Sequence, residues 1–577
     1  MRIQDAILWL EQGRGARLLA AAAAVLAAVA FSGVLAFKQF RGPLTEETLV
    51  QAEMGRALAE GKGFTTGVRY PRVWAWRAAR GEAFDRDGRD PELYHAPLYA
   101  MAIAAAWTAL PDTVAAELRG PPGLAPDGYG GDYLLLGLNV ALFWLAAGQT
   151  WWLARRWFEP WVAHVAAAGV MLSWPLWEHV LAVDGTALAM VVGLAMWQAL
   201  TRAAAGRAAP AWWLAVGVAA GALALVDYAN VAATIVVAAY VAWRRGRRAA
   251  VLVVAGVVLA MGPWLARNVV VSGHPLGLAG DGFALWAGDP TADPAAWRAS
   301  LEGGSPPVSL AKVANKALSA IEATFAAGPW SAGAMVLAGF FVAAWLYRFR
   351  RDEIEQWRGL ATVALLATVG LQAVIDSGEG ERSALAWGAP WLMIFGAGFL
   401  RILLAGASPA VASRAGWLWA GLLAVQVAPL AQNLLEPRRA HFSFPPYYPS
   451  FFHGLGRQLA ERSVQDVGWM ADVPAGLSWY GGTTVWAQPR ALRDFYAIQA
   501  EQPTGALLLT PATLDRPFFG GLDKAEAGAA GSRFGGWDQI YRGLVTERWP
   551  EAFPLRRRQP VASNLLLLVD DRLIGPR

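Results

Sequence analysis

Apolar stretches of about 17 to 25 residues recur from Arg17 to about Ala431, each long enough to cross a hydrocarbon core as an α-helix. Beyond that point the chain becomes mixed and polar. The pattern predicts a polytopic membrane segment, 1–431, followed by a separate domain, 432–577. After a first helix at 17–37, the predicted spans lie near 133–154, 160–178, 184–202, 211–226, 228–243, 249–266, 329–347, 358–376, 384–404 and 412–431.

The region from 432 onward contains short apolar runs at 467–471, 506–509 and 565–569, which read as strands. A more helical stretch, 490–501, lies between them. We therefore predict a small α/β domain. Because it contains no obvious catalytic pair, we expect it to shape a site without supplying the base.

Arginines set the predicted orientation. Arg2, Arg14 and Arg17 precede the first span, and short basic loops recur at every second later connection, so these segments are assigned to the cytoplasm. This parity gives about eleven crossings, twelve at most, with two large external loops at 38–131 and 267–328 and an external carboxy-terminal domain. The short segment 96–110 does not fit the parity, so we predict a re-entrant or juxtamembrane helix, with a pair of crossings as the alternative.

Composition agrees with a membrane protein, since 56% of the residues are hydrophobic and only 16% are charged. The net charge of +5 is explained by topology, and we expect no nucleic-acid partner. The 30 tryptophans suit interfacial belts. Cysteine is absent, which excludes disulfides and thiolate metal sites. The stretch 17–37 is too long for a signal-peptide core, so we expect it to remain as a helix.

The predicted topology gathers polar residues at the external ends of segments. A charge near the bilayer is costly unless it lines a cavity or forms a pair, so a one-sided cluster indicates a site. Its members are Glu47, His95, Asp184, Asp227, Arg267, Glu379, Glu381 and Arg382.

The first external loop begins with a helical pattern, 45–58, that ends at Gly61 and Gly63. On a helical wheel Glu47 shares the stripe of Val50, Met54 and Leu58. The other acids of this helix are predicted to form a solvated, ion-paired face. Partial desolvation would make the carboxylate of Glu47 bind a proton more readily, as a useful base must. The alternative is that Glu47 is only an acid in the first helical turn, where the helix dipole stabilises it.

These motifs resemble those of the GT-C glycosyltransferases, in the branch of protein O-mannosyltransferases and lipid A aminoarabinose transferases and its bacterial lipopolysaccharide-modifying members. The run from Glu47 to Arg56, followed by Gly61-Lys62-Gly63-Phe64, is similar to the first external loop of that family, which begins with a catalytic acid. The resemblance gives that role to Glu47. The segment Tyr94-His95-Ala96-Pro97-Leu98-Tyr99 is similar to the family's basic element near the donor phosphate, which would make His95 a phosphate ligand.

The strongest match is Gly262-Pro263-Trp264-Leu265-Ala266-Arg267-Asn268, followed by Gly273-His274-Pro275 and 285–289. It implies that Arg267 binds phosphate with Asn268 in support. Glu381 and Arg382 resemble a Glu-Arg element, Asp184 resembles an acid that begins a later helix, and Asp472-Val473-Pro474 with Trp479-Tyr480-Gly481-Gly482 resembles a feature of the external domain of some bacterial members.

Each site residue also has a structural alternative: helix capping for Arg267 and Asp184, an internal ion pair for Glu381 and Arg382, and a structural histidine for His95. The oxygens of Asp184 and Glu47 are acceptable ligands for a divalent cation. No metal-specific spacing supports one, so we predict no metal and no other cofactor.

The resemblance implies an all-α GT-C membrane domain and an inverting glycosyltransferase of the bacterial inner membrane and cell envelope. It would transfer a hexosyl or pentosyl group from a polyprenyl-phosphate donor to an extracytoplasmic lipid, glycan or protein acceptor. Glu47 would be the base, and Arg267, Arg382 and His95 would stabilise the departing phosphate. Two alternatives remain: an exporter of lipid-linked glycans, and a catalytically inactive GT-C scaffold.

Overall fold

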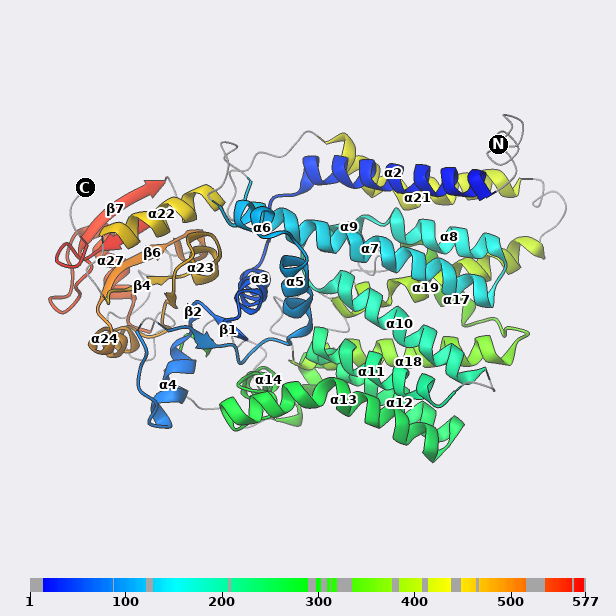
Figure 1. Ribbon diagram of the computed structural model, residues 1–577, viewed down its shortest axis with the longest axis horizontal. Coiled ribbons are helices and arrows are strands. Elements are labelled where there is room, and N and C mark those ends of the chain that lie inside the picture. The colour runs from blue at the N-terminus through cyan, green and yellow to red at the C-terminus, as the bar shows by residue number, and fades with distance from the viewer. Residues whose placement is uncertain are drawn as a thin grey trace.

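Long helices run side by side in one bundle, and a sheet with its own helices lies at one end of that bundle (Figure 1). The carboxy-terminal end of α2 (Arg14–Gln39) and that of α21 (Ala415–Leu435) both point toward the sheet. The computed structural model describes residues 14–86, 88–120, 128–205, 209–288, 297–301, 309–311, 313–318, 335–375, 383–406, 414–436, 448–462, 466–514, 535–562 and 565–574.

Every predicted span coincides with a helix, a helix pair or the described part of one. The predicted span 160–178 is a pair, because α8 and α9 meet at a bend of 50° just before Pro175. The bounds of the remaining bundle helices are α7 (Gly130–Trp157), α8 (Pro160–Met171), α9 (Trp174–Ala182), α10 (Thr186–Ala204), α11 (Ala211–Val226), η1 (Tyr228–Asn230), α12 (Val231–Arg245), α13 (Arg247–Ser272), α17 (Met335–Ala344), α18 (Asp352–Ile375) and α19 (Ser383–Ala405).

Among the described residues, seven helices are long and apolar enough to cross a membrane, or up to nine if each bent pair counts as one span. The helices α11, α12 and the described part of α17 are shorter than eighteen residues. A multi-pass helical membrane protein is therefore confirmed, while the number of crossings stays a prediction.

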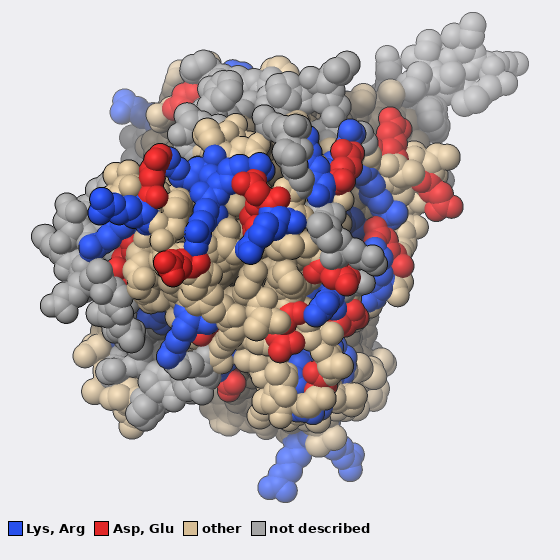
Figure 2. Space-filling model, turned by 90° about the vertical axis from the view of Figure 1, so that its left-hand side faces the viewer, with Lys and Arg blue, Asp and Glu red and all other residues tan. Residues whose placement is uncertain are grey.

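The outside of the bundle is apolar. Leu26 of α2, Val251 of α13 and Trp417 of α21 are 69%, 66% and 82% exposed. Water would penalise so many exposed apolar side chains, whereas lipid tails accept them. By contrast, Figure 2 shows Lys and Arg interspersed with Asp and Glu at the sheet end, as on a surface that meets water.

In the described part of the chain, six strands form one sheet in the order β2-β5-β4-β6-β8-β7. The first four are parallel, and β8 and β7 add antiparallel at the edge. The strands predicted at 467–471, 506–509 and 565–569 are confirmed. The bounds are β2 (Val68–Arg69), β4 (Gly468–Ala471), β5 (Val485–Ala487), β6 (Thr504–Leu509), β7 (Arg557–Ala562) and β8 (Leu565–Val569).

Helices cover both faces of the sheet, so its strands are buried on both sides. Met470 and Leu507 share one apolar core with Phe495 of α24. Trp469 and Leu508 point to the opposite face and join the large core that includes Phe452 of α22. The predicted α/β domain is therefore observed. Its helices are α22 (Pro449–Arg462), α23 (Pro474–Gly481), α24 (Leu492–Glu501), α25 (Pro511–Leu514) and α27 (Asp538–Thr546).

The predicted first external loop, 38–131, supplies part of this sheet. Its strand β2 pairs in parallel with β5, so Val68 lies opposite Val485 across 417 residues of chain. The sheet therefore includes residues from both sides of the proposed boundary at 431/432. The other elements at this end are α3 (Glu46–Ala59), β1 (Thr65–Thr66), α4 (Pro71–Ala79), β3 (Asp90–Pro91), α5 (Leu98–Thr108), α6 (Asp112–Arg119) and α14 (Ala279–Gly288).

The segment predicted to be re-entrant forms α5, which turns through 118° into α6. In Figure 1, α5 runs across the direction of the long bundle helices. Eleven residues of α-helix span only about 16 Å, which is too short for one crossing. The shape agrees with a juxtamembrane helix, although its depth in the bilayer stays a prediction.

Candidate active site

Helix α3 begins where the sequence predicted. The hydroxyl oxygen of Thr45 accepts a hydrogen bond from the backbone N–H of Thr48 at 3.2 Å and caps the helix. Gly61 and Gly63, both with positive φ, then turn the chain away. Gly55 allows close packing on α5, since an added Cβ would lie 2.7 Å from the Ile103 side chain. These features hold α3 between α5 and the sheet domain.

The wheel prediction for the acids of α3 is wrong. The side chain of Glu47 is 57% exposed, while that of Glu53 is only 2% exposed. Glu53 forms an ion pair with Arg89 and accepts a hydrogen bond from the backbone N–H of Gly67 at 2.9 Å. Because α3 packs on two opposite sides, against α5 and against α23, a single apolar stripe does not describe it.

Glu47 contacts an arginine that the sequence did not single out. The Nη2 atom of Arg298 lies 3.4 Å from Oε1 of Glu47. The Arg298 side chain is 11% exposed and stacks over the ring of Tyr94 at 4.9 Å. Burial lowers the pKa of Arg298, but the combined electrostatic effect of Glu47, Tyr70, Tyr94 and Glu92 outweighs burial and raises that pKa overall, so the guanidinium stays charged.

A buried acid lies beneath this pair. Oε1 of Glu92 accepts hydrogen bonds from the backbone N–H groups of Tyr94 and His95, at 2.7 and 3.0 Å, and lies 3.0 Å from Nδ1 of His95. Burial raises the pKa of Glu92, yet the charge and hydrogen bond of His95, the Tyr94 N–H and Arg298 outweigh it and lower that pKa to about 2. Glu92 is thus a carboxylate that fixes His95, with the proton on Nδ1.

Several polar atoms here have no hydrogen-bond partner among the described residues. They are Oε2 of Glu92, the hydroxyl of Tyr94, Nε2 of His95 and Nε of Arg298, and all four are buried. Buried polar atoms normally find partners, so this concentration makes the region a candidate site for a polar ligand. We name Glu47, Glu92, Tyr94, His95 and Arg298 the Glu92 cluster.

Arg267 joins this cluster through the backbone. Its Nη1 donates to the carbonyl of Glu92 at 2.7 Å, and its Nη2 donates to the carbonyl of Phe64 at 3.0 Å. Nη1 also donates to Oδ1 of Asn268, whose amide donates to the carbonyl of Pro275. In this arrangement Arg267 fastens the first external loop to α13 and does not cap its own helix.

The remaining predicted residues lie elsewhere. Asp184 accepts a hydrogen bond from the backbone N–H of Thr186 at 2.8 Å and lies 2.7 Å from Nδ1 of His179, as a capping acid would. Asp227 accepts from the N–H of Ala229. Glu379, Glu381 and Arg382 lie outside the described residues. Within the described ranges, no group of three His, Asp or Glu side chains is placed to hold a metal ion.

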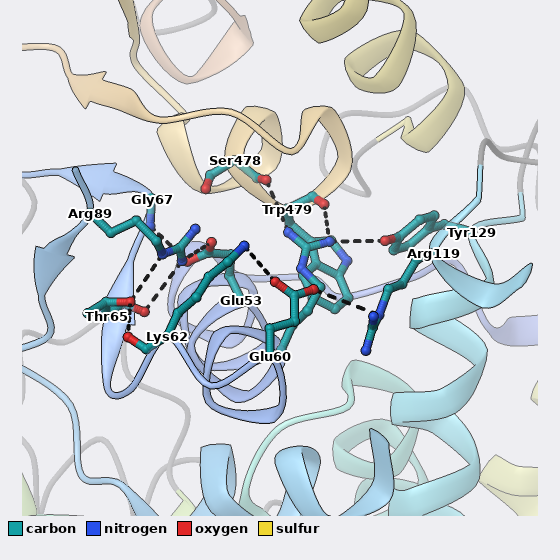
Figure 3. Close-up of polar contacts among 11 residues, drawn as sticks. Glu53, Glu60, Lys62, Thr65, Gly67, Arg89, Arg119, Tyr129, Ser478 and Trp479 are labelled. Atoms are coloured by element: carbon teal, nitrogen blue, oxygen red, sulfur yellow. Dashed lines mark hydrogen bonds and ion pairs between the residues drawn. The ribbon is translucent and has the colours of Figure 1, made fainter. Parts of the chain in front are cut away.

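The contacts between α3 and the sheet domain were not predicted from the sequence. Arg56 donates from Nη1 to the Tyr129 hydroxyl at 3.0 Å and to the Trp479 carbonyl at 2.9 Å, and it stacks over the Trp479 ring at 4.4 Å. Glu46 accepts from the backbone N–H of Ala475. Figure 3 shows the contacts to Tyr129 and Trp479, where α3, the loop after it and α23 meet. Because the acids of this helix were predicted to form a solvated, ion-paired face, the sequence pattern gave no sign that Arg56 contacts the sheet domain.

Asp132 makes a second connection of this kind. Its two carboxylate oxygens accept from Nε1 of Trp479 at 2.9 Å and from the hydroxyl of Tyr480 at 3.0 Å. The Trp479-Tyr480 pair thus contacts both α3 and the start of α7. The motif at 479–482 therefore serves as a joint between the sheet domain and the bundle.

No protein-family model and no curated protein matches this chain. The structure resembles that of ArnT from Cupriavidus metallidurans bound to undecaprenyl phosphate, with a TM-score of 0.53 and 14% identity, over 96% of this chain and 98% of that one. The oligosaccharyltransferase of Archaeoglobus fulgidus has a TM-score of 0.49 and 12% identity, over 84% and 67%. The likeness to ArnT runs through the bundle and the sheet domain together, and the chain thus has the GT-C fold that its motifs predicted.

Proposed function

We propose that this protein is an inverting glycosyltransferase that takes a sugar from a polyprenyl-phosphate donor and transfers it to a lipid, glycan or protein acceptor. The observation that carries the proposal is the Glu92 cluster: an exposed carboxylate, a largely covered arginine and a fixed histidine lie together, and several of their buried polar atoms have no hydrogen-bond partner among the described residues. The fold supports the donor class, because the similar ArnT structure holds undecaprenyl phosphate.

Glu47 is the proposed base. The acceptor hydroxyl attacks the anomeric carbon as its proton passes to Glu47, and the bond from that carbon to the phosphate oxygen breaks on the opposite face. The products are an inverted glycoside and the polyprenyl phosphate. Exposure suits this role, because the carboxylate must meet an acceptor that arrives from outside.

Arg298 and His95 are the proposed phosphate ligands. A guanidinium binds phosphate oxygens through two parallel N–H groups, and Nε2 of His95 is a donor when the imidazole is charged. Such donors stabilise the charge that develops on the leaving phosphate. We propose that Arg267 supports them by holding the backbone of Glu92, with Asn268 fixing the Arg267 side chain. From the sequence motifs, Arg382 remains a candidate phosphate ligand, and Glu381 and Asp184 remain candidate supporting residues.

The donor phosphate also competes for Arg298. In the structure the guanidinium neutralises Glu47, and a bound phosphate would draw it away. Glu47 would then lose its cationic partner just as a donor arrives, which frees its carboxylate oxygens to accept a hydrogen bond from the acceptor hydroxyl. The proposed order is donor binding first and acceptor deprotonation second.

The test is a single-turnover assay on the purified full-length protein with radiolabelled polyprenyl-phosphate sugars. We expect release of polyprenyl phosphate and a product whose anomeric configuration, measured by NMR, is inverted. A product that retains configuration contradicts the single-base mechanism. Donor binding without cleavage, across a panel of sugars and acceptors, favours the inactive scaffold, and transfer of intact lipid-linked glycan between leaflets favours the exporter.

A further inference from the structure

A cavity of about 700 Å³ lies at the end of the bundle opposite the sheet domain. It opens between the last turns of α7, α10 and α12 and the first turns of α18. Its volume lies in the range of small-ligand sites, about 300 to 1,000 Å³. The lining residues are Arg156, Trp157, Ala204, Ala205, Arg244, Arg245, Glu353 and Gln356.

The cavity has an excess of positive charge, with three arginines against one glutamate. Arg156, Arg244 and Arg245 have no carboxylate within 4 Å in the part of the chain that the structure describes. Other arginines at this end are paired, such as Arg348 with Asp352 and Arg401 with Glu159. Three guanidinium groups gathered around one cavity with a single carboxylate, none of them paired with it, make a site for an anion.

The surroundings place this cavity at the level of lipid headgroups. Trp243, next to Arg244, is 76% exposed, and the Arg244 guanidinium lies 4.6 Å from its ring centre. Arg202 lies 4.8 Å from the rings of both Trp152 and Trp212. Trp243 is exposed, and Trp152 and Trp212 are half-buried. Tryptophans beside arginines are typical of the membrane–water interface, where a headgroup is the most abundant anion.

We propose that this cavity binds the headgroup of an anionic phospholipid from the leaflet at that end of the bundle. The phosphodiester would lie between Arg244, Arg245 and Arg156. Glu353 would accept hydrogen bonds from headgroup hydroxyls, which favours a glycerol headgroup over a choline. The site holds the ends of α7, α10, α12 and α18 together, and it does not depend on the glycosyltransferase reaction.

The experiment uses the full-length protein in a neutral detergent and measures lipid binding by native mass spectrometry. The probes are a short-chain phosphatidylglycerol, the phosphatidylcholine of equal chain length, and inorganic phosphate as competitor. The test variant is Arg244→Gln/Arg245→Gln. The matched control is Arg247→Gln/Arg248→Gln, which removes the same charge just beyond the cavity. Melting temperatures of both variants without lipid show that they fold.

We expect phosphatidylglycerol to bind the test variant about thirtyfold more weakly than the parent and the control. Phosphatidylcholine should bind weakly to all three proteins. The proposal is overturned if both double variants weaken binding equally, since general charge would then suffice. It is also overturned if phosphatidylcholine binds as well as phosphatidylglycerol, or if millimolar inorganic phosphate displaces the lipid, which would indicate a site for a soluble anion.

Discussion

The Nη2 atom of Arg298 lies 3.4 Å from Oε1 of Glu47, although 251 residues separate the two in the chain. Glu47 stands in the first turn of α3, where the helix dipole already favours a carboxylate. Arg298 belongs to the second loop that the sequence predicts to be external, 267–328. The contact therefore joins the two predicted external loops at the proposed base, and both side chains can be tested by mutation.

Glu47→Gln should abolish transfer. The amide keeps the size of the side chain but cannot accept a proton, so single-turnover transfer should fall by about a hundredfold or more while donor binding persists. The matched control is Glu60→Gln, an acid at the other end of the helix that pairs with Lys62. Near-normal transfer by a folded Glu47→Gln protein would move the base elsewhere, with Asp184 next. Glu46 and Glu53 are unsuitable controls, because both hold structural contacts.

Arg298→Gln should lower kcat/KM for the donor by about a hundredfold, because a phosphate ligand is lost. Arg80→Gln, a half-exposed arginine at the end of α4, is the control. An unchanged kcat/KM for the donor would show that Arg298 only packs against Tyr94.

Arg56→Ala should loosen α3 from the sheet domain. The change removes charge-assisted hydrogen bonds to the Trp479 carbonyl and the Tyr129 hydroxyl, and the stacking on the Trp479 ring, a loss of about 3 kcal/mol. Hydrogen exchange over residues 46–60 should rise and the melting temperature should fall. Arg493→Ala, which removes an exposed arginine of α24, should leave exchange in α3 unchanged. Unaltered exchange in Arg56→Ala would mean that packing on α5 alone holds the helix.

Removing residues 437–577 should disorder the first external loop. The truncation takes away β5, the sheet neighbour of β2, and the α23 groups that bind Glu46 and Arg56. Although the sheet domain supplies no base in our proposal, donor cleavage should be lost with it. Limited proteolysis between residues 60 and 95 measures the disorder. A truncated protein that stays resistant there and still cleaves donor would contradict the structural role.

Stability should depend on pH through Asp472, which follows β4. Burial raises the pKa of Asp472 from 3.8 to about 6, against hydrogen bonds from Thr510 and Thr513 that lower it. The folded state thus holds the proton more tightly than the unfolded chain. The stabilisation that the proton on Asp472 gives to the folded state is complete below about pH 4 and is lost as the pH rises through 6.

Asp472→Asn removes this dependence. Relative to the parent, the variant should gain melting temperature at pH 7 to 8 and gain little at pH 4 to 5. Asp571→Asn, an exposed acid of the same domain, is the control. A parallel shift at every pH would show that the change acts through packing or hydrogen bonding and not through the proton.

The sequence by itself determined the elements and their order. Lipid and water impose a strong, local demand on each segment, so apolar length located the bundle helices, and short apolar runs located β4, β6 and β8. Thr45, Gly61 and Gly63 fixed the ends of α3 for equally local reasons. The motif residues His95 and Arg267 both bind Glu92, His95 through the Glu92 carboxylate and Arg267 through its backbone carbonyl.

Only the tertiary structure decided which faces are buried and which distant residues meet. A helical wheel assumes one buried face, and α3 has two, which reversed the expected places of Glu47 and Glu53. Arg298 stands in no recognisable motif, and β2 is only two residues long. No local sequence pattern could therefore predict the contact of Arg298 or the pairing of β2. Their roles arise from contacts across more than 200 residues, which depend on how the loops pack and not on the composition of any single segment.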